Sequence, residues 1–195
     1  MKTKLFFAAI LLSFTGFAFA SGDSSELSSD LRNTDNFSGL IVNNSANVVL
    51  SQGDINSIRI EGDKSSMKDI TTKVENGTLV ISGQNNHAVT IYVTMSDINL
   101  VEVNGNAKIY ANDLINSDIL LLKVNGSGSI RMDVRTLTVG MIVKGSGKII
   151  VSGSTGESYS KLIGDGSIYA DNLDARKIDR SASLPQAEKV SLINQ

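Results

Sequence analysis

Apolar and polar residues alternate along a segment that repeats in the second half of the chain. Between residues 101 and 170 one short phrase occurs four times, each with a leading glycine at the same place: Gly105, Gly126, Gly145 and Gly164. The copies are therefore spaced by 21, 19 and 19 residues. A repeat of this length predicts a solenoid, in which each coil is one structural unit stacked on the next.

Every second residue in each copy is apolar or glycine. The first copy places Val101, Val103 and Ile109 on one face of the chain, and Glu102 and Asn104 on the other. Alternation with period two over about ten residues predicts a strand with one buried face. One place in the phrase is always isoleucine, so we expect a single buried column of Ile109, Ile130, Ile149 and Ile168.

Small residues recur where each coil is expected to bend. Side chains from all sides of a narrow coil converge at a corner, where only a very small residue fits, and glycine also allows a sharp turn. We expect these inward corners to be formed by Gly105, Gly126, Gly128, Gly145, Gly147, Gly164 and Gly166. A coil of about 20 residues has a contour of roughly 66 Å, enough for three short sides around a thin apolar core.

The same alternation begins upstream, at Phe37. Asn44, Gly62 and Gly83 occupy the place of the leading glycine in three degenerate copies, and Asn76-Gly77 predicts a local hairpin among them. The sequence therefore predicts one all-β domain over residues 37–175. We expect a single-stranded parallel β-helix of about seven coils with roughly 20 residues per coil.

Both ends of the chain lack the repeat. Residues 1–20 read as a secretory signal peptide, with Lys2 and Lys4 before an apolar run and a small-x-small cleavage site at Ala18–Ala20. Residues 21–36 are polar and serine-rich, which predicts a flexible leader, and residues 176–195 are expected to form a C-terminal cap or tail. We expect an exported protein, periplasmic or secreted to the cell surface. No lipoprotein anchor and no stable membrane insertion after signal cleavage are expected, because the chain has no cysteine and the apolar run is short.

The composition of the chain excludes several kinds of active site and argues against one class of partner. The absence of cysteine removes thiol nucleophiles and thiolate metal sites. Loss of Lys2 and Lys4 with the signal changes the formal net charge from −2 to −4, which argues against nucleic acid as a partner. His87 is the only histidine, so neither a histidine metal site nor a catalytic triad is expected.

The glycine phrases and the carboxylates do not predict an active site. The phrase at 164–166 lacks the lysine and the helix of a phosphate-binding loop. Asp133 and Asp171 occupy the same place in their coils, but the coil between them supplies Ser152, so no two carboxylates on adjacent coils are in register. We therefore predict no catalytic residue, no metal site and no cofactor.

Two outward-facing positions of each repeat form a candidate binding surface. The residues at these positions include Lys108, Tyr110, Arg131, Lys148, Ile150 and Tyr169. Tyrosines with basic and hydroxyl neighbours on a flat sheet can bind a glycan or a protein by stacking and hydrogen bonding. The alternative is that tyrosine and isoleucine are simply favourable residues for an exposed strand.

Three upstream runs precede the Gly-Ser-Gly phrases: Asn47-Val48-Val49-Leu50-Ser51-Gln52-Gly53, Ile58-Arg59-Ile60-Glu61-Gly62-Asp63 and Asn76-Gly77-Thr78-Leu79-Val80-Ile81. Together with those phrases they resemble a known family, the putative autotransporter adhesin, head GIN domain. This resemblance covers residues 37–175. The resemblance implies a right-handed β-helix exported by bacteria, with no established enzymatic activity and no functional residues to carry over.

Three hypotheses about function follow. The leading one is an exported, non-catalytic β-helical domain that acts as a binding, adhesion-type or scaffold module at the bacterial cell envelope, with a glycan or a surface protein as partner. The second is a β-helical carbohydrate-active enzyme, either a polysaccharide lyase or a hydrolase. The third is a structural envelope protein that associates with itself through the ends of the solenoid.

Overall fold

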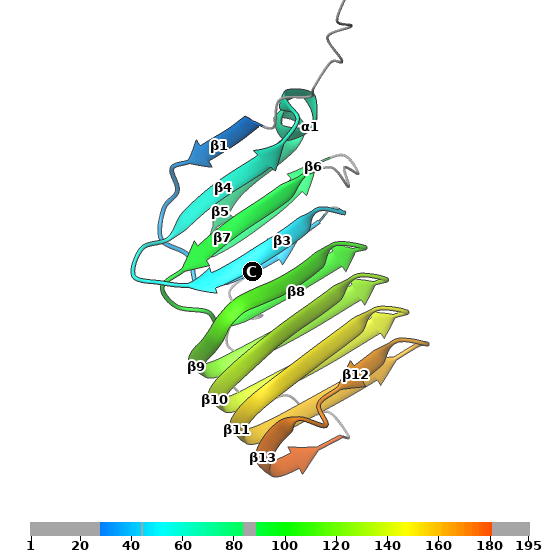
Figure 1. The fold of residues 1–195 in the computed structure, drawn as a ribbon. Helices are drawn as coiled ribbons and strands as arrows, with labels where there is room; N and C mark the ends of the chain where they lie inside the picture. Colours follow the sequence, from blue (N-terminus) through cyan, green and yellow to red (C-terminus); the bar gives the residue numbers. More distant parts are fainter. Residues whose placement is uncertain (1–27, 44, 84–88, 181–195) are drawn as a thin grey trace, which may run out of the picture.

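The computed structural model describes residues 28–43, 45–83 and 89–180 as one elongated stack of β-strands (Figure 1). The expected signal peptide, His87 and residues 181–195 of the expected cap lie outside the described residues. No helix in the described part of the chain is long and apolar enough to cross a membrane.

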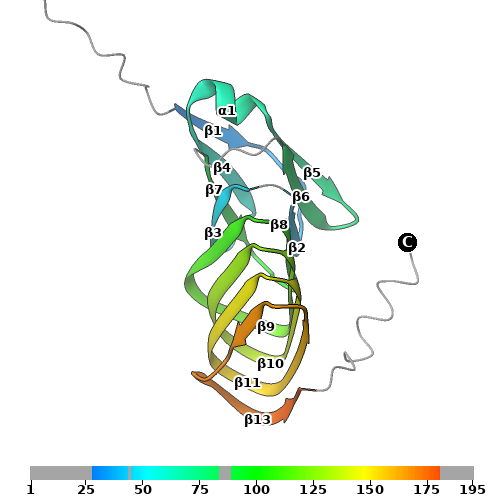
Figure 2. The same ribbon diagram turned by 90° about the vertical axis from the view of Figure 1, so that its right-hand side faces the viewer.

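The C-terminal half is a parallel β-solenoid, as the repeats predict. Its strands are β8 (Leu100–Gly105), β9 (Lys108–Gly126), β10 (Ser129–Gly145), β11 (Lys148–Ile163), β12 (Ser167–Tyr169) and β13 (Leu173–Asp179). Each of the long strands β9, β10 and β11 bends around most of one turn and pairs in parallel with the next (Figure 2). The solenoid has about four turns, so the prediction of seven coils is wrong in number.

The strands of the N-terminal half do not stack in the order of the sequence. Strand β2 (Gly39–Val42) lies between β6 (Thr78–Gly83) and β8, and β3 (Asn47–Gln52) lies between β7 (Thr90–Met95) and β9. All four of these pairings are parallel. The first predicted coil is therefore inserted between strands that follow it in sequence.

The outermost N-terminal strands are antiparallel. Strand β4 (Ser57–Gly62) pairs antiparallel with β7 on one side and with β1 (Ser28–Arg32) on the other. Ile58, Ile60 and Gly62 thus do not begin a coil as predicted, because alternation with period two is the same in parallel and antiparallel strands. The hairpin at Asn76-Gly77 is confirmed: it joins β5 (Ile70–Glu75) to β6, with φ of 49° and 73° at its two turn residues.

The isoleucine column is confirmed and fills the centre of the stack. Ile109, Ile130, Ile149 and Ile168 are partners on successive strands. The first three are at most 1% exposed. Ile168 is only half-buried, because no further turn among the described residues packs on the open side of the last turn.

The repeat glycines perform two different tasks at one corner. The leading glycines have left-handed φ values of 103° to 123°, and Gly105, Gly145 and Gly164 are exposed rather than facing inward as expected. The glycines two residues later face the interior. A Cβ on Gly147 would lie 2.3 Å from Cγ1 of Val124 and 2.8 Å from the carbonyl oxygen of Gly128. The leading glycines allow the backbone to bend at the corner. The inward glycines leave space for the atoms of the adjacent coil.

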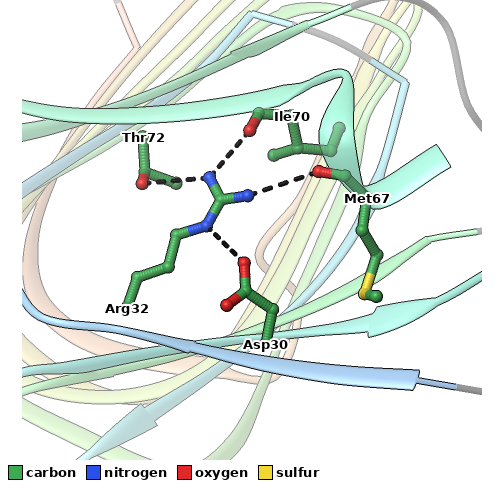
Figure 3. Close-up of polar contacts among 5 residues, drawn as sticks. All are labelled: Asp30, Arg32, Met67, Ile70 and Thr72. Atoms are coloured by element: carbon green, nitrogen blue, oxygen red, sulfur yellow. Dashed lines mark hydrogen bonds and ion pairs between the residues drawn. The ribbon is translucent and has the colours of Figure 1, made fainter. Parts of the chain in front are cut away.

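Arg32 connects the strands at the N-terminal end of the stack (Figure 3). Its guanidinium donates to the carbonyl oxygen of Ile70 at 2.7 Å, to that of Met67 at 3.3 Å and to Oγ1 of Thr72 at 3.2 Å, and it pairs with Asp30 at 3.0 Å. These contacts join β1 to β5 and to the short helix α1 (Lys64–Lys68). Ser28–Arg32, predicted to lie in the flexible leader, is therefore part of the folded unit.

Replacing Gly147 by valine should destabilise the protein by about 3 kcal/mol or more, because the new side chain overlaps Val124 and a main-chain carbonyl. The adjacent Lys148→Ala, at an exposed outward position, should change the free energy of unfolding by less than about 0.5 kcal/mol. Chemical denaturation of the two variants checks this. Equal losses would mean that the inward and outward assignments are wrong.

Replacing Arg32 by methionine should lower the free energy of unfolding by about 1–3 kcal/mol, because it removes the side-chain donor to the Ile70 carbonyl and to Oγ1 of Thr72. The Met67 carbonyl keeps the backbone amide of Asp69 as a donor. The control is Arg176→Met, which removes an exposed cation from β13. Thermal unfolding should show a lower Tm only for the first variant. An unchanged Tm for Arg32→Met would show that β1 is held by its main-chain pairing alone.

Candidate binding surface

One sheet of the molecule presents a continuous outer face. It runs through β1, β4, β7, β3 and the first segments of β9, β10 and β11 to β12, and is seen in Figure 1. Outward residues in register on these strands form what we call the outer column: Leu31, Arg59, Tyr92, Val49, Tyr110, Arg131, Ile150 and Tyr169. Seven strand spacings give the outer column a length of about 34 Å.

The sequence-predicted residues lie together in the C-terminal half of this column. Tyr110, Arg131 and Tyr169 are on β9, β10 and β12, and the tyrosines are 48% and 47% exposed. Lys108 and Lys148 are in the neighbouring column, where serines alternate with them: Lys108, Ser129, Lys148 and Ser167. Lys148 Nζ lies 5.7 Å from the centroid of the Tyr169 ring, within reach of a cation–π interaction.

Sequence reasoning missed the N-terminal half of the outer column. Tyr92 and Arg59 belong to it, and the Arg59 guanidinium lies 4.0 Å above the Tyr92 ring while also pairing with Glu61. The alternation of β7 predicts a strand, but no feature of the sequence places β7 beside β3. The ring of Tyr92 is thus covered by a cation, whereas the ring of Tyr110 has no ring contact among the residues that the structure describes.

The other long sheet carries a ladder of amides that bond to one another. Asn104 donates to Oδ1 of Asn43 at 2.8 Å, and Asn125 donates to Oδ1 of Asn104 at 2.8 Å and to Glu102 at 3.0 Å. Lys123 lies 3.6 Å from Glu102. Because these groups already bind one another, this ladder stabilises the stack rather than offering free donors to a ligand.

The carboxylates of Asp133 and Glu157 bind hydroxyl and ammonium groups rather than one another. Asp133 accepts a hydrogen bond from Ser152. Glu157 accepts one from the hydroxyl of Tyr159 and lies 3.5 Å from Lys177, and these contacts, the tyrosine first, hold the pKa of Glu157 below its ordinary value. The same hydrogen bond raises the pKa of Tyr159. Within residues 28–43, 45–83 and 89–180, no three acidic or histidine side chains are placed to hold a metal ion.

A hollow of about 350 Å³ opens at the C-terminal end of the solenoid core. Its apolar lining includes Met141, Leu162, Ile168, Leu173 and Ile178. Leu162 and Ile178 are 49% and 57% exposed. The hollow is the cross-section of the core, left open where the described turns end.

Comparison with known proteins gives a family and a fold. The family model described as "Putative auto-transporter adhesin, head GIN domain" matches residues 36–183. No protein of curated function matches the chain.

Crystal structures of bacterial proteins share the fold. A putative adhesin from Bacteroides fragilis is 20% identical with a TM-score of 0.70, covering 80% of this chain and 75% of its own. A putative lipid binding protein from Parabacteroides distasonis is 16% identical with a TM-score of 0.64, covering 80% and 78%. A putative adhesin from Parabacteroides merdae is 17% identical with a TM-score of 0.61, covering 80% and 77%.

Replacing Glu157 by glutamine should lower the Tm at neutral pH, because the carboxylate is stabilised by Tyr159 and Lys177 in the folded state. A pKa held below its unfolded value adds stability above that value, about 4.3, and the contribution is lost as the pH falls further. The Tm difference between wild type and Glu157→Gln should therefore shrink below about pH 4. Asp113→Asn is the control at an exposed position, and a difference that persists unchanged in acid would contradict the assignment.

Proposed function

The chain belongs to the putative auto-transporter adhesin, head GIN domain family, and from this premise we propose that it is an exported, non-catalytic binding module of the adhesion type. We propose that it acts at the bacterial cell envelope, with a glycan or a surface protein as the partner. The family description and the adhesin names of two structural relatives support a binding role. The lipid-binding name of a third relative also describes binding rather than catalysis.

The observation that carries this proposal is the C-terminal half of the outer column. Tyr110 and Tyr169 lie on strands whose main chains pair in parallel with a neighbouring turn. Tyrosine rings give a large contact area with few rotatable bonds, and a fixed backbone lowers the entropy lost on binding. A continuous face of paired strands with exposed rings favours an extended ligand over a small buried one.

The polar neighbours of the two rings fit a hydroxyl-rich ligand. Lys108, Ser129, Lys148 and Ser167 run beside the outer column. Ammonium and hydroxyl groups donate to the oxygen atoms of sugars, while the tyrosine rings pack against their C–H faces. This combination supports a glycan as the partner more directly than an apolar protein surface.

The test is glycan-array binding by the mature protein and by a Tyr110→Ala/Tyr169→Ala double variant. Loss of two stacking rings, at about 0.5–1.5 kcal/mol each, should weaken binding roughly tenfold. Leu137→Ala is the control, since Leu137 is 64% exposed on another side of the solenoid. Full binding by the double variant would reject this surface. The absence of any bound glycan or envelope protein would reject the function.

A further inference from the structure

Three cations lie on adjacent strands beside the two exposed tyrosines, Tyr110 and Tyr169. Lys108 is on β9, Arg131 on β10 and Lys148 on β11, and all three side chains are exposed. Lys108 and Lys148 are both partners of Ser129, so they lie two strand spacings apart, about 10 Å. Arg131 follows Ser129 by two residues, which places its Cα about 8 Å from each lysine's Cα. The three residues thus form a triangle on one face.

These three cations differ from the others on the same sheet. Arg32 pairs with Asp30, and Arg59 pairs with Glu61 and stacks on Tyr92. Lys108, Arg131 and Lys148 make no ion pair with any residue that the structure describes. The N-terminal part of the face is neutralised internally, and the C-terminal part is not.

The carboxylates near the triangle lie at its margins. Asp133 follows Arg131 on the outward side of β10 and is bound by Ser152, and Asp165 lies in the exposed turn before Ser167. Asp113 and Asp171, also exposed, lie beyond Tyr110 and Tyr169 in the sequence. The three cations thus lie together at the centre and the carboxylates around them, and a local group of unpaired cations attracts the anionic groups of a ligand to that position.

We propose that this surface binds an anionic polysaccharide that lies along the solenoid axis. Its sugar rings stack on Tyr110 and Tyr169, and its carboxylate groups bind Lys108, Arg131 and Lys148. This inference rests on the proposed function and adds the charge class and the direction of the ligand. Because the two tyrosines are three strand spacings apart, about 14 Å, a chain of several sugars reaches both, whereas a compact anion reaches only one.

A single-stranded nucleic acid also combines negative charge with stacking groups, but the surface favours it less. Nucleic-acid grooves hold many phosphates with a broad basic surface, and affinity depends on the number that are neutralised. Here the cations number three, and the chain as a whole is negative. Alternating lysines and serines fit the sparser charge and the many hydroxyls of an acidic glycan.

The test compares acidic polymers with neutral ones in the presence of EDTA, which removes bridging calcium. The acidic panel is polygalacturonate, alginate and chondroitin sulfate, and the neutral panel is fully methyl-esterified polygalacturonate and dextran. The mature protein should bind at least one acidic polymer about tenfold more tightly than any neutral one. That advantage should fall as the salt concentration rises.

Matched variants separate a local from a general charge effect. The triple variant Lys108→Gln/Arg131→Gln/Lys148→Gln should lose the preference for acidic polymers. The control Lys64→Gln/Lys68→Gln/Lys144→Gln removes the same charge from exposed positions off this face and should keep it. Circular dichroism of both variants should match the wild type, since all six positions are exposed.

The outcomes distinguish this inference from the function on which it rests. Equal binding of acidic and neutral glycans, lost in the tyrosine double variant, would overturn the charge inference and leave the binding function in place. No binding of any glycan would overturn the charge inference and the choice of a glycan as partner, and would leave a surface protein as the partner of the binding function. Tighter binding of single-stranded DNA than of every acidic polymer, or equal losses in the two triple variants, would also overturn the proposed site.

Discussion

The structure depends on main-chain hydrogen bonds between turns rather than within them. At the corner, the amides of Ser129 and Lys148 donate to the carbonyls of Ala107 and Gly128, one turn away, at 2.9 Å each. A single turn buries too few side chains to offset the entropy of ordering its backbone, so it is stable only when it is stacked. This pairing fixes the register between strands. The register in turn places equivalent residues of successive turns above one another, both on the inner and on the outer face of the sheet.

The same register therefore builds the core and the candidate surface. Inside, it aligns the isoleucines into one column, and outside, on the same strands, it aligns Tyr110, Arg131 and Tyr169. The spacing of the outward groups is set by the strand spacing and not by local side-chain contacts. A ligand that matches this spacing meets groups that are already in position, so little ordering is needed on binding.

The sequence predicts the C-terminal half well and the N-terminal half poorly, for a physical reason. Between residues 101 and 170 neighbouring turns are also neighbouring repeats, so the sequence spacing and the spatial spacing coincide. In the N-terminal half the neighbours of β2 and β3 are distant in sequence, and alternation does not encode strand direction or partner. Tyr92 and Arg59 were missed for that reason. The leading glycines were recognised in the sequence. The sequence did not show whether each glycine is needed for its left-handed φ value or because there is no space for a side chain.

The position of β2 and β3 has a consequence for how the chain acquires its shape. Both strands are held between partners that follow them in sequence: β2 needs β6 and β8, and β3 needs β7 and β9. When only the first 70 residues have been synthesised, β2 and β3 do not yet have any of these partner strands. Pairing on both sides of β2 and β3 therefore waits for synthesis of β8 and β9, whereas the β1–β4 and β5–β6 pairs need only segments that are made earlier. Because the contacts that join the two halves of the molecule span the longest sequence distances, we expect them to form late, after the first turn of the solenoid has been made.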